Sequence, residues 1–112
     1  MARLSITVTE PDTDRGTVCL ALSGDLDLAT RQDLMAVVPV VLDRIPQKIV
    51  IDLAGIGMLD SAGIGALVSV WKAAHPAECG VEVRNPSRLA YWQLELSGLL
   101  EFFAVQPTNP SS

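Results

Sequence analysis

The sequence predicts an α/β sandwich with a mixed sheet of four to five strands and about three to four helices. Two segments that alternate apolar and polar residues come first, at 4–9 and 17–23, and each has the pattern of a half-buried strand. The segment 48–53 is almost continuously apolar, which is typical of a central strand covered on both faces. From residue 30 onward, segments with helical spacing alternate with strands, which predicts helices packed on the sheet.

The length of the chain, 112 residues, predicts a single domain, which we assign to residues 4–105. Hydrophobic residues make up 49% of the chain, but only 4% of residues are aromatic, so aliphatic side chains must build the core. Residues 106–112 are polar and contain proline, and we expect this tail to be disordered.

The charge and hydropathy of the chain argue against several functions. A net charge of -5, with scattered basic residues, argues against binding to nucleic acid or to an anionic membrane surface. The N-terminus lacks the apolar run of a signal peptide, and no stretch reaches the roughly 18 apolar residues of a membrane helix. We therefore expect a soluble, cytoplasmic protein.

Polar segments follow each of the first two strands. Residues 10–16 have the composition of a turn between these strands. Residues 24–29, which include Asp25 and Asp27, are expected to form an acidic loop. This loop would lead into the first helix.

The first helix is predicted over residues 31–44, where apolar residues recur at helical spacing. Thr30 and Asp33 resemble a capping box at its start, with Asp33 in place of the usual Glu or Gln. Pro39 lies inside the helix and removes a backbone donor, so we expect a bend near Val38 or two shorter segments.

The central strand is expected to end at Leu53, and the glycine-punctuated residues 54–59 are expected to connect it to a second helix. This helix, over 61–74, has an apolar stripe formed by Ile64, Leu67, Val68 and Trp71. Pro76 forces its end.

A third helix is predicted over residues 86–97. Asn85 would be its N-cap and Pro86 its first residue, and Gly98 would end it. Residues 99–105 would then add a short turn and a last edge strand.

The cysteine and histidine content argues against a metal site. Cys19 and Cys79, the latter opening a fourth strand over 79–84, form no Cys-x-x-Cys and are expected to be buried, inert thiols. The single histidine, His75, cannot make a histidine cluster alone. We therefore expect no metal and no cofactor.

The segment around Ser61 does not match the catalytic motifs that it partly resembles. A Gly-x-Gly pair precedes it, but Asp60 occupies the position of the third glycine in a dinucleotide fingerprint. In a hydrolase elbow a glycine would replace Leu59. His75, the only histidine that could act as base, would lie about 21 Å away along the same helix. We therefore expect no enzymatic activity.

A helix start explains the Asp60-Ser61 pair without any further function, because either side chain can act as the N-cap. A phosphate on Ser61 would also be tolerated there, because free N–H groups and the positive end of the helix dipole favour anions. Such a modification would change the surface charge beside Asp60 and switch a partner interface without unfolding the domain.

Four segments of the chain resemble the STAS domain family, in particular the stand-alone bacterial anti-sigma factor antagonists. In the family's order they are SGDLDLAT at 23–30, IVIDL at 49–53, LDSAGIGAL at 59–67, and NPS at 85–87 with LELSGL at 94–99. The similarity spans about residues 4–105, and its most specific part is Asp-Ser-x-Gly-x-Gly. It implies a STAS-type sandwich for this chain.

The resemblance also implies a phosphorylation cycle. Ser61 corresponds to the serine that the cognate anti-sigma factor, a serine kinase, phosphorylates in the family. The unphosphorylated protein would bind this kinase and release a sigma factor for transcription, and a PPM-type serine phosphatase would restore it after phosphorylation. The residues implied in partner binding surround this serine and are Asp25, Asp27, Asp60, Ala62, Gly63 and Ile64.

The chain departs from the family's pattern at several places, of which two bear on the site. Ala62 stands where many members have a second serine, which leaves a single acceptor. Tyr91 and Trp92 occupy positions of the third helix that are often charged in relatives. Either Trp92 is buried with Leu89 and Leu96, or Tyr91 and Trp92 form an exposed patch for a partner.

A second function is compatible with the same residues. The chain could be a STAS subunit that works constitutively, as an accessory to a lipid-transport ATPase or in another signalling complex, without a phosphate cycle. Full function after loss of the Ser61 hydroxyl would distinguish this alternative from the phosphorylation switch.

Overall fold

The computed structural model describes residues 3–11 and 16–105, so residues 12–15 of the predicted turn at 10–16 and the predicted tail at 106–112 lie outside the described residues. The elements, in chain order, are β1 (Leu4–Thr9), β2 (Thr17–Leu26), α1 (Arg31–Leu42), β3 (Lys48–Leu59), α2 (Ser61–Ala74), a 3₁₀ turn (His75–Ala77), β4 (Gly80–Arg84) and α3 (Arg88–Leu96). The sheet has the order β1-β2-β3-β4, with β1 antiparallel to β2 and the other neighbours parallel. The predicted α/β sandwich with a mixed sheet is confirmed.

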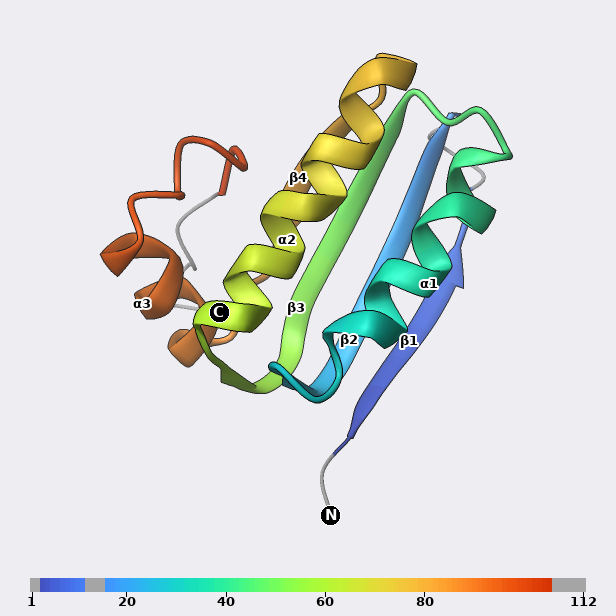
Figure 1. Cartoon of the computed structure of the whole chain (residues 1–112). Coiled ribbons are helices and arrows are strands. Elements are labelled where there is room, and N and C mark those ends of the chain that lie inside the picture. Colours follow the sequence, from blue (N-terminus) through green and yellow to red (C-terminus); the bar gives the residue numbers. More distant parts are fainter. Residues whose placement is uncertain (1–2, 12–15, 106–112) are drawn as a thin grey trace.

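The helices α1 and α2 lie side by side on one face of the sheet, and α3 lies at the far side of α2 from α1 (Figure 1). The core between these two layers is aliphatic, as expected: its fully buried side chains include Leu20, Leu34, Ile51 and Leu67. Each such side chain contributes about 1.5–3 kcal/mol by leaving water. Phe103 adds a buried aromatic ring from the segment after α3.

The strands β2 and β3 are longer than predicted, so the expected acidic loop at 24–29 is wrong over 24–26, and the expected connection at 54–59 is wrong throughout. The two strands stay paired up to Leu26 and Leu59, with register shifts between Ala21 and Ser23 and between Gly24 and Asp25. Leu26, Ile56 and Leu59 are buried, and this burial holds the extended segments in the sheet.

Helix α1 is one continuous helix that ends at Leu42, so the predicted division into two segments is wrong. Pro39 lies on its exposed side, where the missing N–H group can be replaced by water. The predicted capping box is also wrong, because the Thr30 side chain makes no capping bond to the helix and instead donates to the carbonyl oxygen of Asp25, 2.8 Å away.

Helix α3 begins at Arg88, two residues later than predicted. Its N-cap is Ser87, whose Oγ accepts a hydrogen bond from the N–H of Ala90 at 3.2 Å. Asn85, the predicted cap, has a left-handed backbone (φ 50°), and its side chain donates to Asp52 at 3.1 Å. The polar residues before the helix therefore connect it to the sheet.

The segment after α3 forms turns in place of the predicted edge strand at 99–105. Gly98 follows the helix with φ 72°, a conformation that favours glycine and turns the chain, as expected at this end. The N–H of Val83 in β4 donates to the carbonyl oxygen of Phe103 at 3.1 Å, so this segment covers the outer edge of β4.

The two cysteines are free thiols. Cys79 is buried as predicted, whereas Cys19 is half-buried. Burial raises the pKa of both thiols, which lowers the fraction of the reactive thiolate.

The start of α2 sits directly on the end of β2, and a glycine makes this approach possible. A Cβ atom on Gly63 would lie 2.1 Å from the carbonyl oxygen of Leu26 and 2.9 Å from the Leu59 side chain. Gly65, two residues further along the same helix, is exposed and would meet nothing within 4 Å.

These two glycines form a matched pair for measuring that contact. We expect Gly63→Ala to lower the free energy of unfolding by about 2 kcal/mol or more, because a backbone carbonyl must move to admit the methyl group. Gly65→Ala should raise it by about 0.5–1 kcal/mol, because alanine favours helix over the unfolded chain. Urea denaturation followed by circular dichroism measures both, and equal effects would contradict the close contact.

Candidate functional site

Asp60 is the residue that caps α2. Its backbone is extended (φ -103°, ψ -175°), and its Oδ1 accepts a hydrogen bond from the N–H of Gly63 at 2.8 Å. Its carbonyl oxygen accepts from the N–H of Ile64 at 2.9 Å. Of the two candidates for the N-cap, the structure selects Asp60.

Ser61 is the first residue of α2, and it is exposed. Within the described part of the chain, its hydroxyl takes part in no hydrogen bond. Two other serines differ: Ser69 donates to the carbonyl oxygen of Gly65, and Ser87 caps α3. The Ser61 hydroxyl therefore faces solvent at the positive end of a 14-residue helix.

Asp27 builds the turn between β2 and α1. Its Oδ1 accepts hydrogen bonds from the N–H groups of Ala29 at 3.0 Å and Thr30 at 3.1 Å. The N–H of Asp27 in turn donates to Thr30 Oγ1 at 3.1 Å. The carboxylate thus has a structural role that the sequence did not indicate.

The register of β2 and β3 brings the predicted site residues to one end of the sheet. Leu26 pairs with Leu59, so Asp27 and Asp60 each follow one of two neighbouring strand ends. The turn after β2 and the start of α2 therefore lie next to each other (Figure 1). Asp25 belongs to the same end, because it pairs with Met58 in β3.

The predicted apolar residues of the site differ in exposure. Gly63 is buried against Leu26, so its role is to seat the helix. Ala62 is half-exposed beside the serine, and Ile64 is half-buried against the core.

Sequence reasoning missed two apolar side chains at this end. Leu28, in the turn that Asp27 builds, is 64% exposed, and Met58, next to Asp25 in the sheet, is 45% exposed. Leu28 could have been noticed as an apolar residue in an acidic segment. Met58 carried no signal, because its exposure depends on β3 extending to the end of the sheet.

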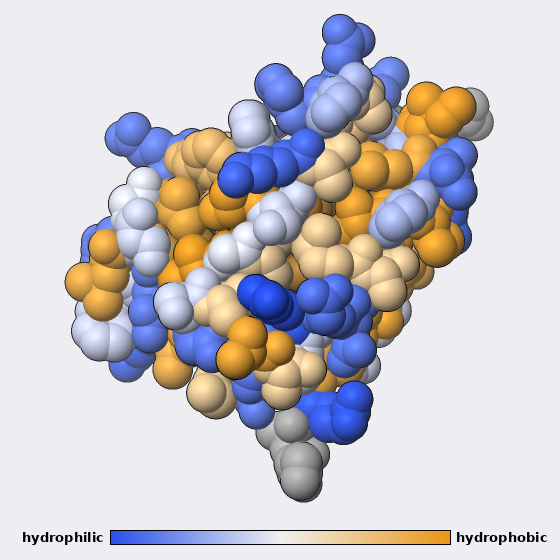
Figure 2. All heavy atoms as spheres, in the orientation of Figure 1, coloured by the Kyte–Doolittle hydropathy of each residue, from blue (hydrophilic) through white to orange (hydrophobic). Residues whose placement is uncertain are grey.

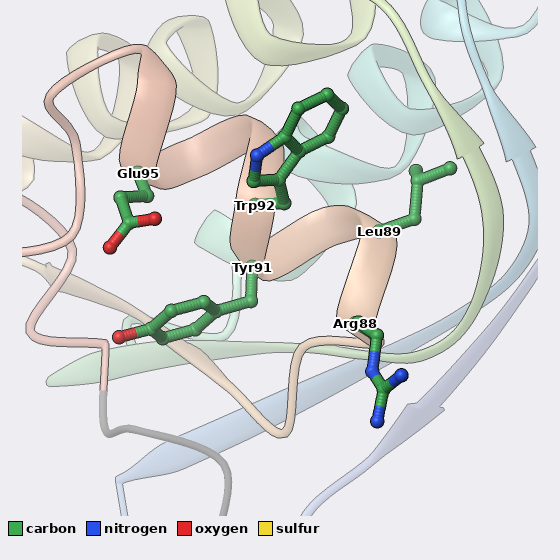
Figure 3. A pocket seen from close by; sticks show the side chains of 5 residues that line it. All are labelled: Arg88, Leu89, Tyr91, Trp92 and Glu95. Carbon is green, nitrogen blue, oxygen red and sulfur yellow. The ribbon is translucent and has the colours of Figure 1, made fainter.

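Of the two alternatives for helix α3, burial of Trp92 with Leu89 and Leu96 is wrong, because Trp92 is exposed, whereas Tyr91 is half-buried. Trp92 is 55% exposed, and the helix buries Ala90 and Leu94 instead. Trp92 and Leu89 project from one side of the helix and help line an open hollow of about 590 Å³ (Figure 3). The other residues that line this hollow are Arg88, Tyr91 and Glu95.

The described residues provide neither a cluster of metal ligands nor a helix able to span a membrane. None of them forms a group of three or more His, Cys, Asp or Glu side chains able to hold a metal ion. None of the described helices combines the length and the apolar character needed to cross a membrane.

Comparison with solved structures finds the same fold in several proteins. An anti-sigma factor antagonist from Mycobacterium paratuberculosis is 26% identical, with a TM-score of 0.74 over 94% of this chain and 86% of that one. The unphosphorylated form of the anti-sigma factor antagonist SpoIIAA is 18% identical, with a TM-score of 0.75 over 93% and 90%. SpoIIAA from Bacillus has also been solved in its phosphorylated form, at 18% identity and a TM-score of 0.67 over 93% of each chain.

The fold also occurs as part of a membrane transporter. The murine anion transporter Slc26a9 is 16% identical, with a TM-score of 0.67 over 97% of this chain but only 21% of the transporter. No match among curated proteins reached significance. The family model described as "Mlab, STAS domain" matches residues 9–105, and this match shows that the chain belongs to the STAS domain family.

Proposed function

We propose that this protein is a cytoplasmic anti-sigma factor antagonist whose partner binding is switched by phosphorylation of Ser61. Without phosphate it binds an anti-sigma factor that is a serine kinase, and this binding releases a sigma factor. Phosphorylation by that kinase ends the binding, and a PPM-type phosphatase reverses it. The protein acts by binding and catalyses no reaction itself.

One observation carries this proposal: among the residues that the structure describes, the Ser61 hydroxyl makes no hydrogen bond. Asp60 supplies the cap, so a phosphate on the exposed Ser61 hydroxyl would leave the helix start intact. Because the N-terminal end of a helix favours a negative charge, we expect the phosphorylated protein to stay folded. The solved phosphorylated and unphosphorylated forms of SpoIIAA, which has the same fold, support such a cycle.

The surroundings of Ser61 have the composition of a protein-binding surface. Leu28 and Met58 present apolar side chains next to the acidic residues Asp25, Asp27 and Asp60. Exposed apolar side chains supply binding energy, and charges around them set specificity and the rate of association. A phosphate on Ser61, next to Asp60, would add about two negative charges to the end of the sheet that carries this surface.

Phosphorylation should occur at Ser61 alone. Incubation with the cognate kinase and ATP is expected to add one phosphate per chain, which peptide mass spectrometry would locate at Ser61. Ser61→Ala should abolish the label, whereas Ser69→Ala, which removes another serine of the same helix, should leave it unchanged. Phosphate incorporated into the Ser61→Ala variant would contradict the proposed site.

A negative charge at Ser61 should weaken binding without unfolding the domain. We expect Ser61→Asp to raise the dissociation constant for the anti-sigma factor at least about tenfold, or about 1.4 kcal/mol. Its thermal unfolding midpoint should equal that of the wild type, because an acidic residue suits the first turn of a helix. Calorimetry and a melting curve measure the two effects. Unchanged affinity would argue against the charge switch, and Ser61→Asn controls for size.

The occurrence of this fold within an anion transporter supports the second candidate, a constitutive subunit of a transporter complex. In that case the Ser61→Ala variant would retain full function in the cell, and the chain would copurify with a transporter ATPase. Loss of function in the Ser61→Ala variant would favour the antagonist.

A further inference from the structure

The two edges of the sheet differ in their protection. The edge of β4 is covered by the segment after α3, through the bond between Val83 and Phe103, and β4 carries the charged residues Glu82 and Arg84. Within the described residues, no strand or loop covers the outer edge of β1. β1 contains no charge and no proline, and its register with β2 is regular. Such an edge is able to accept another strand.

Helix α1 leans over this edge, as two ion pairs show. Arg3, just before β1, lies 3.9 Å from Asp33, near the start of the helix. Glu10, just after β1, lies 3.3 Å from Arg44, just beyond the end of the helix. Each pair is exposed and adds little stability. Together they show that the side of α1 bearing Asp33 and Arg44 faces the β1 edge.

An apolar stripe lies between these two charged residues. Val37 and Val40 follow Asp33 at intervals of four and three residues, and Arg44 follows after four more, so all four share one side of the helix. Val40 is 59% exposed. In Figure 2, apolar side chains gather over α1 and the neighbouring sheet edge, at the right of the view. The strand β1 adds three half-buried apolar side chains that pack against the core: Leu4, Ile6 and Val8.

We propose that this surface, formed by the β1 edge and the Val37–Val40 side of α1, binds a second copy of the chain. The two β1 strands would pair antiparallel about a two-fold axis and join the sheets into one of eight strands. Leu4, Ile6 and Val8 of each copy would then lie on the same side of the joined sheet, as the axis requires.

The two-fold axis brings opposite charges of the two copies together, and it also brings their apolar residues together. The axis exchanges the two ends of β1, so Arg3 approaches Glu10 of the other copy. Along helix α1, the pair Asp33 and Arg44 and the pair Val37 and Val40 are centred on the same point, between residues 38 and 39. If the axis passes near this point, it exchanges the two members of each pair between the copies. Each Asp33 therefore approaches Arg44 of the other copy, and the two valines meet between these charges.

The spacing of the layers also fits. If each α1 covers β1 and β2, the two copies of α1 are separated by about two strand spacings, roughly 9.6 Å. Packed helices prefer 8–10 Å between their axes. Helix α2 lies on the other side of α1, so Ser61 remains accessible in the dimer (Figure 1).

Sedimentation velocity over a range of concentrations tests the dimer. The wild-type chain is expected to show twice the monomer mass, and Val40→Lys is expected to raise the dimer dissociation constant at least about tenfold. The matched control is Leu96→Lys on α3, where a leucine of similar exposure (65%) is replaced and the dimer should be unaffected. A wild-type chain that stays monomeric, or a dimer lost only with Leu96→Lys, would overturn the proposal.

A charge exchange tests the arrangement of the two copies. Asp33→Lys alone and Arg44→Glu alone should each weaken the dimer, because each places like charges across the axis. The double variant restores opposite charges between copies, but it leaves like charges beside Arg3 and Glu10 within each copy. Dimerisation regained in the double variant therefore comes from contacts between copies. A double variant as weak as the single ones would contradict this two-fold arrangement.

Discussion

The candidate site depends on one close contact, between Gly63 at the start of α2 and the carbonyl oxygen of Leu26 at the end of β2. This contact requires a residue without a Cβ atom and holds the helix directly on the strand end. Because Leu26 is paired with Leu59, the same contact fixes where β3 ends and where the chain turns into α2. The acidic turn and the exposed serine are neighbours as a consequence.

The polar residues at this end have separate tasks. Asp60 satisfies a free N–H group of α2, and Asp27 satisfies two N–H groups in the turn before α1. A hydrogen bond of this kind, which forms in place of a bond to water, stabilises the folded state by about 1 kcal/mol. Ser61 makes no such bond among the described residues, so phosphorylation of its hydroxyl breaks no hydrogen bond there. Structural roles for the aspartates thus support a regulatory role for the serine.

Local patterns predicted most of the architecture. The alternation over β1 and the apolar stripe of α2 predicted the bounds that the structure has, because both depend on residues close in sequence. The extension of β2 and β3 was missed, since glycines and acidic residues there are typical of loops and only pairing between the two strands overrides this preference. The sequence left the exposure of Trp92 open for a related reason. The side of α3 that is buried depends on Ser87 bonding to Leu53, a contact between distant segments.

The two proposed surfaces bind their partners through different interactions. We therefore expect phosphorylation to regulate one of them and not the other. The Ser61 surface is acidic and changes with phosphate, whereas the β1 surface combines backbone bonds, apolar contacts and balanced charges. Exposed charges beyond about 8–10 Å are largely screened at physiological salt, and α2, which begins at Ser61, lies on the side of α1 away from the β1 edge. We therefore expect a phosphate on Ser61 to leave the contact between copies largely unchanged. A two-fold dimer instead presents two Ser61 surfaces at once, and a partner that is itself dimeric would bind both with an avidity that one phosphate reduces and two abolish.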